Sequence, residues 1–390
     1  MTTGNTKHDQ ELMKKINKEL VLHLIREKGP ISRAELARVS NMSSTSIGRI
    51  VSEFIELGFV KETEEKTSGV GRKAVLLDIN PASVYVISLE LDQNATKIGL
   101  VDFNGNINLS QKVNYDPRAN HYESVLKLIC NSVEEFLSGH NIDKSKIIGI
   151  GIAVPGIIDA QKGTVIFSPQ LGWENVDIVK YFEEKLRLKT TIDNVIKSRA
   201  LAENVHGSTK GSKRTALINF GTGVGSALIV EEEIYRGATN SAGEIGHTTV
   251  DPHGRLCECG RIGCLQTYIT EEALLQEAKI YKNISNVNEI FVSADSGEKW
   301  ATRLLDRVYT YMGIAVCNVI CMYNPDTVIL SGKLIDKRPK IIDIIAKKVD
   351  ELIWDPFKNT YNVKGSNLGE SAGILGVSTS VINKYIDIEM

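Results

Sequence analysis

The sequence has no long hydrophobic run. No apolar stretch approaches the roughly 18 to 20 residues that a helix needs to cross a bilayer. The first residues, MTTGNTKHDQELMKKINKEL, are polar and have no apolar segment of the kind that a secretory signal carries. We therefore expect a cytoplasmic protein without a membrane partner.

The chain also has little net charge and few cysteines. Its 46 Lys and Arg nearly balance 48 Asp and Glu, for a formal net charge of -2, so any surface for nucleic acid must be local. Residues 1–80 carry 13 basic against 11 acidic side chains, whereas residues 81–390 carry 33 against 37. Six cysteines in a reducing compartment argue against disulfides. A length of 390 residues with 42% hydrophobic residues predicts two or three folded domains.

Residues 1–80 have the pattern of a winged helix-turn-helix, a DNA-binding domain. Apolar residues recur at helical spacing up to Gly29 and Pro30, which predicts a first helix over about residues 10–28. The run Ser32-Arg33-Ala34-Glu35 matches a capping box and predicts the start of a second helix. A third helix is expected over residues 43–57, ended by a glycine.

The third helix and the loop that follows it carry the candidate DNA contacts. Short polar side chains near a helix N-terminus, followed by an arginine, suit the phosphates and base edges of a major groove. Basic residues in a polar loop between two strands, expected at residues 59–62 and 74–79, suit a minor groove or the DNA backbone. The predicted contacts are Ser43, Ser44, Thr45, Ser46 and Arg49 in the helix and Arg72 and Lys73 in the wing. The alternative is a small helical domain that docks onto the rest of the chain or onto a protein.

After Asn80 and Pro81, which have the character of a linker, the pattern changes to alternating strands and helices. A hairpin signal at Asn104 and Gly105 joins two of the expected strands. The strand-then-helix cycle occurs twice, which predicts two α/β lobes with a cleft between them. Strands are expected at residues 84–91, 95–102, 107–113, 147–154, 215–219 and 226–230, and helices at 122–137, 270–278 and 300–321.

Four potential metal ligands lie within 18 residues of one another, in the run GHTTVDPHGRLCECGRIGC. His247, Cys257, Cys259 and Cys264 form a closed tetrahedral set for a structural zinc ion, with no position left for a catalytic water. His253 is a rival ligand, and free cysteines in a glycine-rich loop are the alternative to a metal site. Three thiolates bind too tightly for reversible zinc sensing. The remaining cysteines, Cys130, Cys317 and Cys321, are expected in the core.

The winged helix-turn-helix and four further segments together resemble the ROK family (repressors, open reading frames and kinases). The segments are GIGIAVPGIID, NFGTGVGSALI, SAGEIGH and CECGRIGCLQTY. The similarity is greatest to transcriptional repressors of sugar catabolism, such as xylose repressors. It implies a two-lobed, actin-like sugar-kinase fold related to ribonuclease H, a sugar in the cleft and a structural zinc. It also implies a homodimer or higher homo-oligomer that binds a palindromic operator.

The resemblance divides the chain into a DNA-binding domain and an effector domain. We place the first at residues 1–80 and the second at 81–390. One lobe of the effector domain is expected at about residues 81–195 and 373–390, and the other at about 196–372.

The residues that ROK kinases use for phosphoryl transfer are incomplete here. The family's Asp-x-Gly-Gly-Thr phosphate loop corresponds to residues 92–96, where Asn94 and Ala95 replace both glycines. The family's catalytic aspartate corresponds to Val195, which cannot accept a proton. A second glycine-rich loop, residues 221–225, is retained, although an ordinary hairpin turn explains it equally well. We therefore expect no kinase activity.

The sugar contacts that the resemblance implies are partly retained. Gly156, Asn194, Glu244 and His247 would face the ligand hydroxyls. Gln266 stands where the family usually has a glutamate, and Lys197 adds a cation nearby. These two residues argue against a plain glucose or xylose pattern and admit a modified, acidic or phosphorylated sugar, or a weakened pocket. The alternatives to a sugar-controlled repressor are an active sugar kinase with a DNA-binding appendage and a DNA binder whose cleft is vacant.

Overall fold

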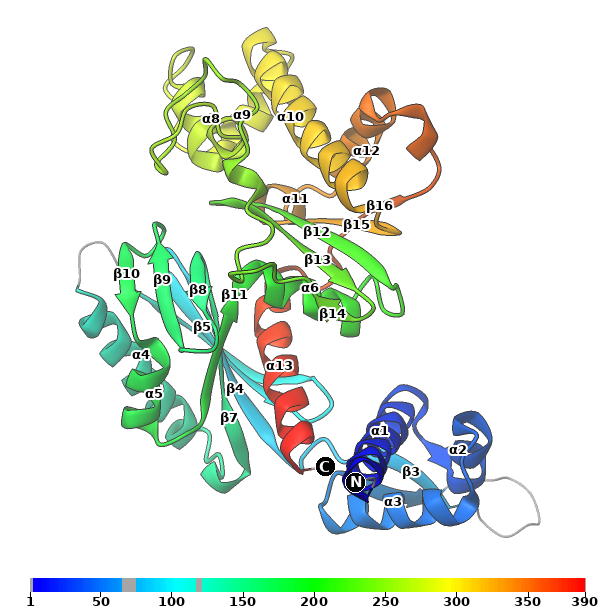
Figure 1. Ribbon diagram of the computed structural model, residues 1–390. Helices are drawn as coiled ribbons and strands as arrows, with labels where there is room; N and C mark the ends of the chain where they lie inside the picture. Colours follow the sequence, from blue (N-terminus) through cyan, green and yellow to red (C-terminus); the bar gives the residue numbers. More distant parts are fainter. Residues whose placement is uncertain (1–2, 65–74, 117–120, 390) are drawn as a thin grey trace.

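The computed structural model describes residues 3–64, 75–116 and 121–389. Three units follow one another in Figure 1: a small domain at the N-terminus, a lobe built on one five-stranded sheet, and a second lobe built on another. The predicted architecture, a winged helix-turn-helix followed by a two-lobed α/β body, is confirmed.

The N-terminal domain forms as its caps and apolar spacing predict. Ser32 Oγ accepts the Glu35 amide at 3.2 Å, and Ser43 Oγ accepts the Ser46 amide at 3.1 Å, so both serines cap helices. The Glu35 carboxylate does not complete the predicted reciprocal bond to the cap; it accepts from Arg38 instead. The elements are α1 (Thr3–Lys28), β1 (Ile31–Ser32), α2 (Arg33–Ser40), α3 (Ser44–Glu56), β2 (Val60–Glu64) and β3 (Val75–Ile79), with sheet order β1-β3-β2.

The first lobe is a mixed sheet with strand order β11-β7-β4-β5-β6. The β4, β5 and β6 strands form the predicted antiparallel meander, while β7 and β11 run parallel to β4. One face packs on α4 and α5, and α13 lies against β4, β5 and β7. The elements are β4 (Tyr85–Asp92), β5 (Ala95–Asp102), β6 (Ile107–Asn114), α4 (Tyr122–Gly139), β7 (Ile147–Val154), β8 (Ile157–Asp159), β9 (Thr164–Ser168), β10 (Trp173–Val176), α5 (Ile178–Leu186) and β11 (Thr190–Asn194).

The second lobe repeats the plan with strand order β14-β13-β12-β15-β16. Its core is the largest apolar cluster and joins the sheet to the helices above it in Figure 1. The elements are β12 (Arg214–Phe220), β13 (Val224–Val230), β14 (Glu233–Ile234), α7 (Gln266–Ile269), α8 (Glu271–Ala278), α9 (Val287–Asp295), α10 (Lys299–Tyr323), β15 (Thr327–Ser331), α11 (Lys333–Asp336), α12 (Lys340–Leu352) and β16 (Asn362–Gly365).

One helix of the second lobe, α10, is long and apolar enough to span a membrane by length and composition. Its most apolar window is 56% buried within the protein, and the helix packs against α9 and α12. These contacts are those of a core helix. Its last turn extends beyond the core, so Cys321 is exposed, and the prediction that Cys321 is a core residue is wrong. Cys130 and Cys317 are buried, as predicted.

Two helices connect the lobes, α6 (Val195–Val205) and α13 (Ala372–Glu389). The α6 helix contacts α13 on one side and β12 and β13 on the other. The two helices approach so closely that a Cβ on Gly376 would lie 1.7 Å from the Ser198 carbonyl oxygen. The α13 helix, red in Figure 1, runs from this contact toward the N-terminal domain.

The N-terminal domain and the first lobe share one apolar core. The Phe59 ring stacks on Phe103 with 5.0 Å between centroids and meets Tyr385 of α13 edge-on at 5.9 Å. Val381 and Ile382 of α13 belong to the same buried cluster as the residues that hold α1 and α3 together. Burial of apolar surface is the main stabilising contribution to such contacts, so the DNA-binding domain is firmly docked on the lobe.

Candidate functional site

The exposed side of α3 carries the predicted DNA contacts. Ile47, Ile50, Val51 and Phe54 are buried, which leaves the polar side of this strongly amphipathic helix outward. Ser43, Ser44, Thr45 and Arg49 are exposed, and Ser46 is partly exposed. The predicted wing residues, Arg72 and Lys73, lie outside the described residues.

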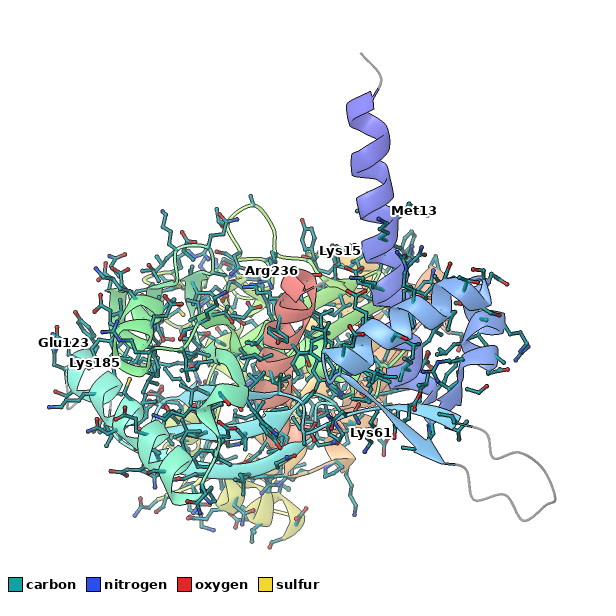
Figure 2. All side chains as sticks on the ribbon, turned by 90° about the horizontal axis from the view of Figure 1, so that it is seen from below. Met13, Lys15, Lys61, Glu123, Lys185 and Arg236 are labelled. Atoms are coloured by element: carbon teal, nitrogen blue, oxygen red, sulfur yellow. The ribbon has the colours of Figure 1, made fainter. Side chains whose placement is uncertain are left out.

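The α1 helix adds cations beside α3 that the sequence analysis did not single out. An open groove of about 530 Å³ lies between the two helices, and Ser46 and Arg49 line it together with Lys14 and Lys15. Figure 2 shows α1 projecting from the body beyond Met13 and Lys15. The sequence does show these lysines on the first helix, but the sequence analysis used only the apolar residues of that helix.

A cavity of about 370 Å³ lies between the two lobes. The first lobe contributes residues at the ends of β4, β7 and β11, and the second contributes the turn between β12 and β13 and the segment that contains Glu244. Five of the six predicted effector contacts line it: Gly156, Asn194, Glu244, His247 and Gln266.

Lys197 is the predicted contact that does not line the cavity. Its side chain is buried, and Nζ donates to the Asn240 carbonyl oxygen at 2.6 Å. Burial lowers the pKa of this ammonium, an effect that the charges of Asp193 and Glu244 oppose. Lys197 does not reach the cavity because of its place on the helix. The α6 helix begins at Val195, and a rotation of about 100° per residue puts Lys197 on the opposite side from Val195 and Arg199, which do line the cavity.

Asn194, which lines the cavity, hydrogen-bonds to the first turn of α6 and to the segment after β7 that contains Gly156. Its Oδ1 accepts the Ile196 and Lys197 amides at 2.8 and 3.2 Å and so caps α6, while Nδ2 donates to the Gly156 carbonyl oxygen at 2.9 Å. Gly156 has a φ of +107°, and a Cβ there would lie 2.4 Å from the Phe167 carbonyl oxygen. Only glycine fits that position, so its backbone stays close to the cavity.

An ion pair that the sequence analysis missed, between Asp193 and Arg236, joins the end of β11 to the second lobe. Arg236 donates to both carboxylate oxygens of Asp193, at 2.9 and 2.7 Å, and Asp193 is buried. Such bidentate geometry is among the strongest that ion pairs adopt. The partners are 43 residues apart, and no local spacing in the sequence indicates their contact.

The metal-ligand cluster is present in the folded chain. The ligand atoms of His247, Cys257, Cys259 and Cys264 all lie within 4.8 Å of one another. His247 Nδ1 is 3.7 Å from Cys257 Sγ, and Cys259 Sγ is 3.6 Å from Cys264 Sγ. A tetrahedral ion with metal–sulfur bonds of about 2.3 Å would separate its sulfurs by about 3.8 Å. The four residues can therefore hold a metal ion; His253, the rival ligand, is not in this cluster.

The cluster shapes one wall of the cavity. His247, Cys259 and Gln266 line the cavity, and Gln266 Nε2 donates to Cys257 Sγ at 3.4 Å. The same loop places Glu258 and Arg261 on the cavity wall, two residues that the sequence analysis missed. Burial raises the pKa of Glu244, and this is opposed by His247 and Lys197.

The opposite end of the cavity corresponds to the nucleotide side in the kinase interpretation. Gly221, Thr222 and Gly223 line it and also form the tight turn between β12 and β13, so both interpretations of this loop agree with the structure. Arg199 Nη2 donates to Glu90 Oε1 at 2.5 Å, and both residues line the cavity, as Val195 does.

The folded chain resembles known proteins over nearly its whole length. The ROK family profile matches residues 86–384, and a winged helix-turn-helix DNA-binding profile matches residues 15–61. The xylose repressor of Caldicellulosiruptor bescii is 30% identical over 389 residues, which are 96% of this chain and 97% of that protein. The xylose repressor of Bacillus spizizenii is 29% identical over 380 residues, 97% and 98% of the two chains. The NagC regulator of Escherichia coli K12 is 24% identical over 374 residues, 93% and 92% of the two chains.

Two solved structures agree with these relatives. A ROK family transcriptional regulator that is a homologue of the E. coli MLC protein superposes with a TM-score of 0.82 at 23% identity, covering 97% of this chain and 98% of its own. A ROK glucokinase from Streptomyces griseus, in complex with glucose and AMPPNP, has a TM-score of 0.67 at 25% identity and covers 76% and 98%. The chain belongs to the ROK family, with a winged helix-turn-helix DNA-binding domain before its ROK domain.

Proposed function

We propose that the protein binds an operator sequence through α3 and the wing, and that a sugar in the cavity between the lobes controls this binding. The observation that carries the proposal is that one chain combines a DNA-binding domain, in which α3 exposes its polar side, with a cavity between the two lobes of a ROK domain. The xylose repressors among the relatives make D-xylose the first candidate effector.

Some of the predicted DNA contacts would determine which base sequence is bound, and the others would add affinity for any DNA. Arg49, Ser44 and Thr45 would reach base edges, while Ser43, Ser46, Arg72 and Lys73 would hold phosphates. Lys14 beside the same groove would add to the phosphate contacts. We expect a homodimer on a palindromic operator, since a two-fold protein matches two half-sites. Such a protein acts in the cytoplasm, where the operator is.

The effector would lie at the end of the cavity formed by Asn194, Glu244 and His247. Carboxylate and amide oxygens accept hydrogen bonds from vicinal hydroxyls, and Gln266 and the Gly156 backbone complete that end of the cavity. Lys197 does not line the cavity, so it does not supply the cation that was proposed for an acidic or phosphorylated sugar, although Arg261 does line the cavity.

We propose zinc as the ion of the metal cluster, because three cysteines and one histidine at these separations suit it. Zinc bound at Nδ1 of His247 would fix the histidine tautomer. His247 would then keep its proton on Nε2 and donate it to a sugar hydroxyl. Since the four ligands close the coordination shell, the role is structural.

We propose that the protein does not phosphorylate its sugar. Val195 cannot take a proton from a hydroxyl, and losing a general base costs about 10² to 10⁴ in rate. The Arg199–Glu90 pair also occupies the nucleotide side with an internal salt bridge. A coupled assay with ATP and D-xylose is expected to give no turnover, and phosphorylation at ordinary enzyme rates would overturn this proposal.

Gel-shift titration of the full-length protein on DNA from its own promoter region tests the repressor proposal. We expect a complex that persists in excess competitor DNA of unrelated sequence. Arg49→Ala should weaken this complex by about 1 to 3 kcal/mol and relax the preference for the specific site, as loss of a base contact does. Ser52→Ala, also on the exposed side of α3 but outside the predicted contacts, is the matched control. Equal binding to both DNAs would contradict the proposal.

A further inference from the structure

The α6 helix reaches from the cavity to a point close to the DNA-binding domain. Its first turn is capped by Asn194, and Val195, Ile196 and Arg199 line the cavity. Eleven residues at about 1.5 Å each carry it about 16 Å to its C-cap, His206. A displacement at the capped end therefore moves His206 as well, since a buried helix moves largely as a rigid body.

His206 lies where three elements meet. Its Nε2 is 3.0 Å from Thr379 Oγ1 of α13, and its ring lies so close to Gly105 that a Cβ there would be 2.5 Å from the ring. Thr379 already donates its hydroxyl proton to the Leu375 carbonyl oxygen at 2.8 Å, so Nε2 of His206 must be the donor. Burial, together with the nearby charges of Arg26 and Lys210, lowers the pKa of His206 to about 4 and keeps the imidazole neutral.

The turn on which His206 packs contacts the DNA-binding domain directly. Gly105 lies in the turn between β5 and β6, two residues after Phe103. The Phe103 carbonyl oxygen accepts from Arg26 Nη2 of α1 at 2.8 Å, and its ring stacks on Phe59. Phe59 in turn donates its amide to the Phe54 carbonyl oxygen of α3 at 2.9 Å, which joins this contact to the predicted DNA-reading helix.

We propose that His206 is the positioning residue that couples the sugar cavity to the DNA-binding domain, because it joins the far end of α6 to α13 and to the turn that holds Arg26 and Phe59. The inference rests on the proposed function. His206 contacts neither the cavity nor the predicted DNA contacts, so its role is in the response and not in either binding event. Coupling between two sites amounts to about 5- to 150-fold in affinity, and His206 would carry a large part of it.

The test measures the operator dissociation constant of full-length protein with and without D-xylose, for wild type, His206→Ala, Thr379→Val and His140→Ala. We expect His206→Ala to keep the operator affinity without sugar and the D-xylose affinity within about threefold, while the sugar-induced change in operator affinity falls below about twofold. Thr379→Val keeps the volume but removes the hydroxyl, and with it the bonds to His206 and to the Leu375 carbonyl, and should reduce the response at least twofold. His140→Ala is the matched control, because His140 is also a helix C-cap, and its ring hydrogen-bonds to the Phe136 carbonyl within its own helix instead of to another element.

The outcomes separate this inference from the proposed function. A wild-type response that persists at full size in His206→Ala and Thr379→Val overturns the inference and leaves the proposed function in place. A lost response in His140→Ala also overturns it, since the loss is then not specific to this junction. If wild type itself shows no response, the proposed function fails and the inference fails with it. If His206→Ala melts too early to assay, the Thr379→Val response decides.

Discussion

Cys259→Ser is expected to lower the melting temperature of the protein by about 5 to 10 °C, although Cys259 is an exposed residue. An exposed free cysteine contributes little to stability, and its replacement by serine is normally within about 0.5 kcal/mol of neutral. If Cys259 holds a structural metal with His247, Cys257 and Cys264, the same change opens the coordination shell and costs about 2 to 4 kcal/mol. The large effect of a surface substitution is therefore diagnostic of the metal.

Cys321→Ser is the matched control, because Cys321 is also exposed and lies outside the cluster. We expect it to leave the melting curve and the bound metal unchanged. The measurement is differential scanning calorimetry together with elemental analysis of the purified protein. Equal melting temperatures for the two variants would contradict the metal site, as would a Cys259→Ser protein that retains a full equivalent of zinc.

Glu244→Ala is expected to weaken sugar binding by about 10- to 100-fold. Hydrogen bonds to a charged group contribute about 1.5 to 3 kcal/mol each, and Glu244 is the carboxylate beside His247 at the proposed sugar end of the cavity. Binding of D-xylose by isothermal titration calorimetry measures the effect. Operator binding without sugar should remain, since Glu244 is remote from α3.

Thr222→Ala separates the two ends of the cavity. Thr222 lines the glycine-rich turn at the nucleotide side, so its removal should leave D-xylose affinity within about twofold. If Thr222→Ala and Glu244→Ala weaken binding equally, the sugar does not lie where we place it. Glu244→Gln, which keeps the shape and one acceptor, should have an intermediate affinity.

Local signals predicted the N-terminal domain and the metal cluster well. Helix caps are interactions over three residues, and Ser32 could be identified as a cap from its neighbours alone. The four candidate metal ligands were found because they lie within 18 residues, so a single loop brings them together. The prediction of these features needed no knowledge of how distant segments pack.

Features that depend on distant segments could not be predicted. The Asp193–Arg236 pair joins two lobes, and the stacking of Phe59 on Phe103 joins two domains, yet neither has a signature in the sequence. Lys197 was misplaced for a different reason. No helix was predicted at residues 195–205, and two residues along a helix turn a side chain by about 200°, so Lys197 points away from the side on which Val195 lines the cavity.

Cys321 shows a further limit of periodicity. It is four residues after the buried Cys317 on an apolar helix, which predicts a shared buried face. The last turn of α10 extends beyond the core, and Met322 is 70% exposed there. Spacing identifies the face of a helix, but not how far along the helix the core reaches.

Sugar control of operator binding is tested most directly by the operator dissociation constant of the full-length wild-type protein, measured by fluorescence anisotropy with and without saturating D-xylose. Binding of the sugar is verified in the same samples by a shift in melting temperature. We predict that the sugar changes operator affinity by at least about fivefold, because a ligand that controls a repressor must bind its two states with different affinity. An unchanged operator affinity in protein that demonstrably binds the sugar would contradict the account.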